Sequence, residues 1–400
     1  MKKNWICGVD LGSSKITGVI GRVEGKTLSI FGATSVESSG IAKGVVTDLG
    51  ETSSAVKDLV DRLEFQTKLR LEGTFLALNG AHLECVALQV RELVLEKGKE
   101  ITPREVRHIL HQAQSFSLPM NRRLLHLLLQ GYVVDGQEGI RNPVGMYAHR
   151  LGVQLKGVTG VSSFIQNAVT SVNRAGLDVE GIVLSGYATG LAALGKEERN
   201  LGTLFLEIGE EISSLLSFRG GGVTHVKLFP VGGRRITEKV AKAFEIPLQE
   251  AEALKKQYGS LFLPESAASH ELLANDGSRQ KVILKKDLCE VVQQATHELF
   301  QAFQKEIKDL SPGRPTLTLA GGGALLEGIV EAAGTFFQCS SRLGKIESVQ
   351  SAKPLPFSFA TAAGLLWYGH EKQKEEKLLL PDHPAGRLYA KVKALFLDYF

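Results

Sequence analysis

The stretch Ile6–Ile20, ICGVDLGSSKITGVI, contains two apolar runs that flank a short polar turn. Such a pattern predicts two strands joined as a hairpin. The small residues of the turn, Gly12, Ser13 and Ser14, allow backbone N–H groups to approach an anion, and Lys15 adds a positive charge. Asp10, at the end of the first strand, could hold Mg²⁺ through water. The turn is therefore a candidate phosphate-binding loop, and an ordinary hairpin turn is the alternative.

A second copy of this pattern follows roughly 200 residues later. The stretch Thr203–Phe218, TLFLEIGEEISSLLSF, again has an apolar run, an acidic residue, a turn with glycine and a second apolar run. A third glycine-rich loop, Gly321–Ala324, follows the apolar run Thr316–Leu319 and leads into a helix-like segment. Two such units and a late glycine loop predict duplicated domains that face one nucleotide.

The three loops at these spacings resemble those of the actin, Hsp70 and sugar kinase superfamily. The rest of the chain is similar to the FtsA family of bacterial actin homologues. The similar segments are Ser39–Leu49 (SGIAKGVVTDL), Phe75–Cys85 (FLALNGAHLEC), Gly139–Gly145 (GIRNPVG), His225–Gly259 and Ala360–Gly369 (ATAAGLLWYG). The resemblance implies an α/β, actin-like (ribonuclease H-like) duplicated fold with an inserted FtsA-type subdomain. It also implies a cell division adaptor that polymerises with itself, binds the C-terminal peptide of FtsZ and tethers the division ring to the inner face of the cytoplasmic membrane.

The same resemblance divides the chain into subdomains. They are 1A (1–81 and 160–201, with 355–370), the inserted 1C (82–159), 2A (202–233 and 311–354), 2B (234–310), a linker (371–386) and a membrane-targeting helix (387–400). In the family, the insertion contacts neighbouring subunits and other division proteins, and subdomain 2B binds the FtsZ peptide. A merely supporting role for the insertion is the alternative.

Two segments rich in small residues, Ser185–Leu194 and Phe359–Tyr368, are predicted to be helices. Helices that carry Gly and Ala on one face can cross at short distance. By resemblance, these two cross between the halves of the molecule and form its hinge.

The resemblance also implies a site for ATP or ADP with Mg²⁺. Besides the first loop, the second loop contributes Glu207 and Gly209, and Gly232 and Gly233 lie close by. Glu252 and Lys255, one turn apart on the predicted helix Gln249–Tyr258, hold the nucleoside. The third loop contributes Gly321, Gly322, Gly323 and Ala324. For Glu252 and Lys255, the alternative is an ordinary surface ion pair.

The second loop departs from the superfamily. Its relatives typically have Asp-Ile-Gly-Gly-Gly-Thr where this chain has Glu207-Ile208-Gly209-Glu210-Glu211-Ile212. The change removes permissive backbone and places two carboxylates where phosphates would bind. The glutamates could point to solvent, weaken binding so that the site holds ADP or nothing, or bind extra Mg²⁺. We expect impaired nucleotide use and at most a weak ATPase. The rival interpretations are an active ATPase or sugar kinase, and a PilM-like assembly scaffold.

The end of the chain predicts a membrane anchor. The charged segment Glu371–Gly386 contains two prolines and is expected to be a linker with a reach on the order of 20 Å. In the following helix, one face carries Leu388, Val392, Leu395, Phe396 and Tyr399, with Phe400 at the end; Arg387, Lys391 and Lys393 lie off that face. An amphipathic helix with aromatic and basic residues suits an anionic membrane surface. A helix docked on the protein's own core is the alternative.

Composition excludes other classes of function. The 400 residues carry a net charge of only +4, so no electrostatic argument for nucleic acid arises. The sequence shows neither a signal peptide nor a run of apolar residues long enough for a transmembrane helix. The four cysteines are widely spaced and His108 and His111 have no ligand partners at suitable spacing, so no metal site of His and Cys is expected.

Overall fold

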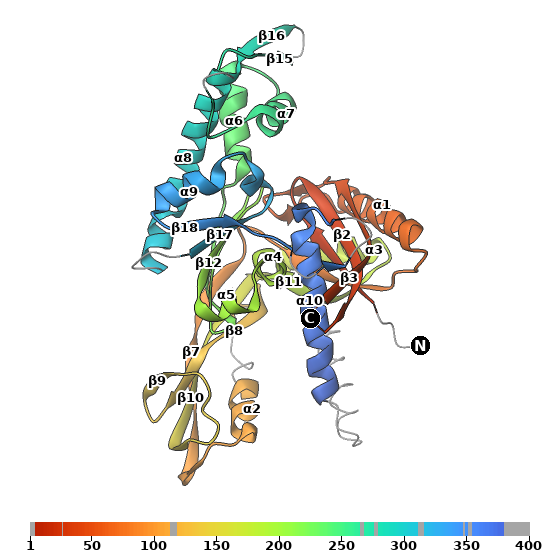
Figure 1. Cartoon of the computed structure of the whole chain (residues 1–400). Helices are drawn as coiled ribbons and strands as arrows, with labels where there is room; N and C mark the ends of the chain where they lie inside the picture. Colours follow the sequence, from red (N-terminus) through yellow and green to blue (C-terminus); the bar gives the residue numbers. More distant parts are fainter. Residues whose placement is uncertain are drawn as a thin grey trace.

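The computed structural model describes residues 5–25, 27–112, 118–264, 268–275, 279–310, 316–346, 349–350 and 354–379. Figure 1 shows two α/β halves on either side of the helices α4 and α10. One end of the molecule is formed by the hairpin β15–β16 above α6, α7 and α8, and the other end by the strands β7, β9 and β10 with α2.

The first half is built on a six-stranded sheet in the order β11-β6-β1-β2-β3-β19. Its strands are β1 (Ile6–Leu11), β2 (Lys15–Glu24), β3 (Thr27–Glu37), β6 (Gly73–Leu78), β11 (Asp178–Leu184) and β19 (Val349–Gln350). Alternate residues of β1 and β2 enter two cores. One core packs on α1 (Leu49–Thr67) and α3 (Ser162–Arg174), and the other packs on α4 (Ser185–Ala193) and α10 (Ala360–Leu379). Helices therefore cover both faces of this sheet.

The second half repeats this topology in a five-stranded sheet of order β14-β13-β12-β17-β18. Its strands are β12 (Thr203–Ile208), β13 (Ser213–Arg219), β14 (Gly222–Phe229), β17 (Thr316–Ala320) and β18 (Ser340–Leu343). β12 pairs antiparallel with β13 and parallel with β17, as β1 pairs with β2 and with β6. The duplicated α/β fold expected from the sequence is confirmed.

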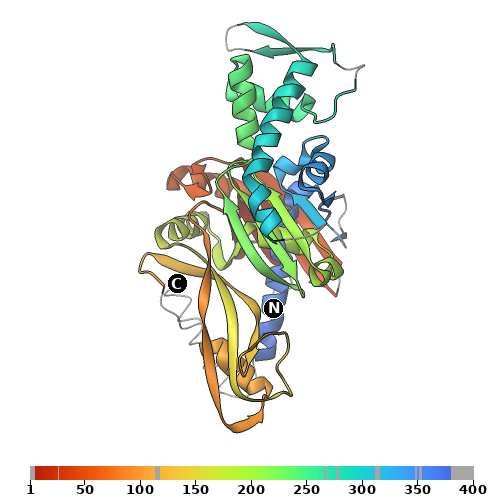
Figure 2. The same ribbon diagram turned by 90° about the vertical axis from the view of Figure 1, so that its left-hand side faces the viewer.

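An inserted domain follows β6. It contains the four-stranded sheet β7-β10-β8-β9 and the helix α2 (Pro103–Gln112). The strands are β7 (Glu84–Glu100), β8 (Arg122–Val134), β9 (Gln137–Ile140) and β10 (Tyr147–Val161). Ile101 and Ile109 pack on β8 and β10 in a core of their own. Figure 2 shows these long strands extending away from the two central sheets.

The remaining elements surround the second sheet or join the halves. Three helices and a hairpin form one end of the molecule: α6 (Gly233–Phe244), α7 (Leu248–Tyr258), β15 (Glu271–Asn275), β16 (Gln280–Leu284) and α8 (Lys285–Leu310). The others are β4 (Ile41–Ala42), β5 (Val45–Val46), α5 (Lys196–Leu201), η2 (Gly322–Leu325), α9 (Ile329–Phe337) and η3 (Phe357–Phe359). Apolar residues along α8, among them Val292, Leu299 and Phe303, pack into the core of this half.

The helices α4 and α10 cross in close contact, as expected from their small residues. A Cβ added to Gly364 of α10 would lie 1.8 Å from the carbonyl oxygen of Ala188 in α4. Gly8 of β1 approaches α10 in the same way, because its Cβ would lie 2.6 Å from the Ala362 oxygen. On the other side, a Cβ on Gly186 of α4 would lie 2.3 Å from Ser214 Oγ in β13. The two helices thus pack backbone on backbone with each other and with β1, and α4 packs on side chains of β13 in the second sheet.

Three expectations need correction or stay open. The sequence pattern of Gly160–Ala175 predicts a helix, but β10 continues to Val161 and α3 begins at Ser162. The segment from Glu371 was predicted to be a linker, yet α10 continues to Leu379, because EKQKEEKLL consists of strong helix formers and the first proline comes only at Pro381. The rest of the linker and the helix 387–400 lie outside the described residues. Within the described part of the chain, no helix is long and apolar enough to span a membrane.

We predict that Gly364→Ala destabilises the protein by about 3 kcal/mol, because the added methyl group must push α4 and α10 apart. Gly222→Ala is the matched control, since a Cβ at Gly222 meets nothing within 4 Å, and it should cost less than about 0.5 kcal/mol. Urea unfolding of both variants measures the difference. Equal midpoints for the two variants would contradict the close crossing.

Candidate functional site

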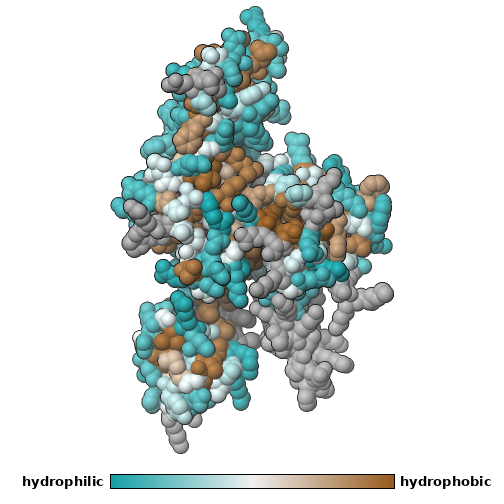
Figure 3. Space-filling view, viewed as in Figure 1, coloured by the Kyte–Doolittle hydropathy of each residue, from teal (hydrophilic) through white to brown (hydrophobic). Residues whose placement is uncertain are grey.

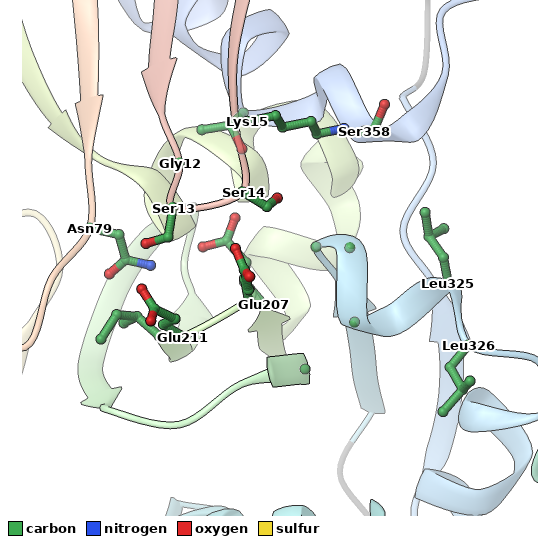
Figure 4. Close-up of a pocket in the computed structure, with 18 of the residues that line it drawn as sticks. Gly12, Ser13, Ser14, Lys15, Asn79, Glu207, Glu211, Leu325, Leu326 and Ser358 are labelled. Carbon is green, nitrogen blue, oxygen red and sulfur yellow. The ribbon is translucent and has the colours of Figure 1, made fainter. Parts of the chain in front are cut away.

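A cavity of about 540 Å³ lies between the two halves, and the β1–β2 and β12–β13 turns both line it. Figure 3 shows apolar side chains gathered at the centre of the molecule, where the halves meet. Figure 4 shows polar side chains of the two turns converging inside the cavity. An apolar pocket with convergent polar groups is the usual form of a small-molecule site.

The two turns have the same local geometry. In each, four residues lie between the last residues that pair across the hairpin, 12–15 in the first and 209–212 in the second. A Cβ on Gly12 would lie 2.6 Å from the Lys15 oxygen, and one on Gly209 would lie 2.5 Å from the Ile212 oxygen. Glycine is therefore required at both positions, which explains why the sequence pattern repeats.

Two carboxyl groups, Asp10 and Glu207, stand at equivalent places just before the turns. Glu207 accepts hydrogen bonds from Thr189 Oγ1 at 2.6 Å and Ser214 Oγ at 3.0 Å, and Ser185 Oγ donates to Asp10 at 3.3 Å. Burial, and secondly the charge of Glu207, raise the pKa of Asp10 to about 7. Burial likewise raises the pKa of Glu207.

These carboxyl groups fit the surroundings of a phosphate-bound Mg²⁺. Magnesium prefers oxygen ligands and usually keeps several waters when it is bound with phosphates. In the described parts of the chain, no three His, Cys, Asp or Glu side chains are grouped as metal ligands. A magnesium ion would therefore depend on Asp10 and Glu207 together with water and a ligand's own oxygens, and would supply charge neutralisation there.

The opposite wall of the cavity carries the predicted pair on α7. Lys255 Nζ lies 2.5 Å from Glu252 Oε2, 2.7 Å from Thr237 Oγ1 and 3.2 Å from the Gly233 oxygen. The Lys255 side chain is only 12% exposed, so burial lowers its pKa. This pair is enclosed in the cavity wall and is not a solvated surface contact.

The second turn places its glutamates on the rim of the cavity. Glu210 Oε1 lies 3.3 Å from Arg234 Nη1, and the Arg234 amide donates to the Glu210 carbonyl at 2.8 Å. Glu211 Oε2 accepts a hydrogen bond of 2.6 Å from the backbone amide of Lys43, which belongs to the first half. Neither glutamate points freely to solvent, since their side chains are 25% and 13% exposed.

Most of the residues predicted from the sequence come together around this cavity. Those that line it are Asp10, Gly12, Ser13, Ser14, Lys15, Glu207, Gly209, Gly233, Glu252, Lys255, Gly321, Gly322 and Gly323. Gly232 and Ala324 do not line it. Gly232 packs beneath the second turn, because its Cβ would lie 2.4 Å from the Gly209 oxygen, and Ala324 is buried in η2.

Other lining residues were missed by the sequence analysis. They include Gly44, Asn79, Ser185, Thr189, Ile236, Lys256, Gln257, Leu325, Leu326, Phe357, Ser358 and Thr361. Asn79 and Ser185 directly follow the parallel strands β6 and β11. Since ligands bind beyond the carboxyl ends of parallel strands, that position was the available signal for both.

The fold and the cavity define an actin-like protein. Among solved structures, the chain is similar to the PilM-PilN type IV pilus biogenesis complex, with a TM-score of 0.64 and 17% identity over 91% of this chain and 98% of that one. It is also similar to MreB 5 of Spiroplasma citri bound to AMPPNP, with a TM-score of 0.57 and 13% identity over 94% and 99% of the two chains. These similarities concern the fold alone.

The sequence comparisons identify the family. Residues 80–159 match the SHS2 domain inserted in FtsA, and residues 204–364 match the family of the cell division protein FtsA. The cell division protein FtsA of Pseudomonas aeruginosa is 31% identical over 380 residues, which are 92% of this chain and 90% of that protein. The chain belongs to the FtsA family of cell division proteins.

The raised pKa of Asp10 predicts a pH dependence of stability. A carboxyl group whose pKa is about 7 when folded and about 3.8 when unfolded binds more protons in the folded state between these values. Its contribution to stability is therefore complete below about pH 4 and is lost as the pH rises to about 7. We predict that the wild type loses roughly 2 to 4 kcal/mol of unfolding free energy between about pH 4 and pH 7, and that Asp10→Asn does not show this loss. Urea unfolding at several pH values measures it. The control is Asp178→Asn, which changes an exposed carboxyl group and should show the same dependence of stability on pH as the wild type. If the stability of Asp10→Asn falls with pH as steeply as that of the wild type, the raised pKa of Asp10 is not the cause of the loss.

Proposed function

We propose that the protein is a cell division adaptor that forms filaments, binds the C-terminal peptide of FtsZ and attaches the division ring to the inner face of the cell membrane. The observation that carries the proposal is the actin-like body with the FtsA-type insertion at residues 80–159. An insertion with its own core and sheet supports contacts with neighbouring subunits and other division proteins. The subdomain boundaries given above are part of this proposal.

The sequence of residues 387–400 supports the membrane attachment. Five large apolar residues on one helical face, with three basic residues off it, give a segment suited to an anionic bilayer surface. Burying such side chains partway contributes roughly several kcal/mol, less the cost of forming the helix. One tail should bind reversibly, and a filament that presents many tails should bind firmly.

The end of the molecule formed by α6, α7, α8 and β15–β16 is our proposed site for the FtsZ peptide. The outer face of its hairpin exposes Leu273 and Val282, which pair across the two strands, and Leu284 beside them. In the same proposed subdomain, α6 carries the basic side chains Arg235 and Lys239 next to Glu298 of α8. Apolar and polar groups are both available there for an extended peptide.

Nucleotide, in this proposal, binds in the cavity between the halves and regulates assembly, and its turnover is slow. The strand register aligns Ser13 with Glu210 and Ser14 with Glu211. The second turn thus presents carboxylates where the first presents hydroxyl donors. Because catalysis of phosphoryl transfer depends on donors and cations around the phosphates, the loss of donors on one side favours a weak ATPase over an active one.

Attachment is tested by flotation with vesicles of phosphatidylcholine that contain about a third phosphatidylglycerol, and by pelleting with FtsZ. We expect the wild type to float and to pellet with FtsZ polymers. Leu395→Glu with Phe396→Glu should abolish flotation but leave pelleting intact. The control is Phe65→Glu, which removes an exposed aromatic residue of α1 (75% exposed) and should keep both. A wild type that neither floats nor pellets would refute the adaptor function.

Turnover is tested with a variant that restores the family loop through Glu210→Gly, Glu211→Gly and Ile212→Thr. We expect the restored loop to release phosphate from ATP at least about tenfold faster than the wild type, because backbone N–H groups and a hydroxyl again face the phosphates. If the wild type releases phosphate at a measurable rate and as fast as the variant, the result favours the active ATPase. The variant Glu238→Gln, outside the cavity, controls for the loss of surface charge.

A further inference from the structure

The short turn between β4 and β5 reaches the cavity from the first half. Lys43 and Gly44 both adopt left-handed backbone conformations, with φ of 50° and 69°. A Cβ on Gly44 would lie 2.1 Å from the Asn79 oxygen, so the turn is fixed against the end of β6. Its two successive amides are both used at the rim: Lys43 N donates to Glu211 Oε2 at 2.6 Å, and Gly44 N donates to Ser13 Oγ at 3.3 Å.

The Glu211 carboxylate joins the two halves of the molecule. One oxygen accepts the Lys43 hydrogen bond from the first half, and the other lies 3.8 Å from Arg234 Nε, on α6 of the second half. Figure 4 shows this carboxylate directed toward Ser13 and Asn79. An oxyanion that accepts an amide hydrogen bond from one half and faces an arginine of the other half has surroundings like those of a bound phosphate group.

Glu210 adds a second negative group at the same rim. One of its carboxylate oxygens faces Arg234, and the other is buried without a hydrogen-bond partner among the described residues. An added anion between the turns would meet both carboxylates in a partly buried setting, where repulsion is weakly screened. The rim is therefore suited to a neutral or cationic neighbour.

Elsewhere in the cavity, the hydroxyl, amide and ammonium donors of the first turn remain available to a ligand. In the described part of the chain, no carboxylate lies within ion-pair distance of Lys15, and Figure 4 shows Lys15 extending away from Glu211 toward Ser358. Ser14 and Gly12 line the same wall. This wall can serve a diphosphate without any contribution from the second turn.

We propose that Glu211 is a built-in substitute for the terminal phosphate of a nucleoside triphosphate. Its carboxylate holds the two halves together and restricts the cavity to nucleoside diphosphates. This inference rests on the proposed function, namely that the cavity binds nucleotide, and it adds which nucleotide binds and which residue selects it.

Titration calorimetry of the full chain with Mg·ADP and Mg·ATP tests the selectivity. We expect the wild type to bind ADP at least about tenfold more tightly than ATP. Glu211→Gln keeps the shape and an acceptor oxygen but removes the charge, so it should bring the two affinities within about threefold. The matched control is Glu238→Gln, which removes a 57% exposed carboxylate that lies 3.5 Å from Arg234 outside the cavity, and it should keep the wild-type preference.

Hydrogen exchange tests the joining role independently of nucleotide. In nucleotide-free protein, Glu211→Gly should speed exchange in the peptide 41–46 at least about tenfold, because the Lys43 amide loses its acceptor. Glu238→Gln should leave that peptide unchanged. Unchanged exchange in Glu211→Gly would overturn the joining role.

The outcomes separate the two proposals. If all proteins bind both nucleotides with the same preference, the nucleotide site stands and the role of Glu211 in selection is wrong. If none of them binds either nucleotide, the nucleotide site of the proposed function fails, and the selectivity fails with it.

Discussion

The crossing of α4 and α10 is the constraint on which the rest of the structure depends. Backbone contact at Gly364 allows Thr189 of α4 and Thr361 of α10 to share a hydrogen bond of 2.9 Å. Thr189 also donates to Glu207, and Ser185 on the same helix donates to Asp10. One helix thus fixes both carboxyl groups, and with them the ends of both strands that lead into the cavity. A shift at the crossing would move both turns, so the crossing and the site form one mechanical unit.

Much of this arrangement follows from local sequence signals. The two hairpins are predictable because each contains its own two strands and its own turn glycine. The close crossing of the two helices is predictable because Gly364 and the residues around it are small. β10 was not predicted because its glycines, among them Gly152 and Gly157, weaken the strand pattern, and its pairing with β7 and β8 is made by tertiary contacts. Gly232 was assigned to the site by family resemblance and Ala324 as the last residue of a glycine-rich loop, but Gly232 packs on the backbone of Gly209 and Ala324 is buried in η2. The tail stays a prediction.

The duplication explains both the symmetry of the cavity and its asymmetry. Gly12 and Gly209 are held by the same backbone approach in each half, so neither position tolerates a larger side chain. The residues between those glycines and the following strands bear no such backbone constraint, and there the two halves have diverged. The first turn carries hydroxyl donors and Lys15, whereas the second carries Glu210 and Glu211. Fold and ligand chemistry are thus controlled by different residues of the same turn.

For the assembly proposed above, this difference between the two turns bears on regulation. In an actin-like subunit, a terminal phosphate that contacts both halves couples nucleotide state to subunit shape, because its loss removes contacts on both sides at once. A carboxylate in the same role cannot be hydrolysed away, so the subunit would keep one shape through binding and release of a diphosphate. In the proposed adaptor, control of filament growth would then pass to protein concentration, to partners and to the membrane, where many weakly binding tails would make attachment depend steeply on filament length.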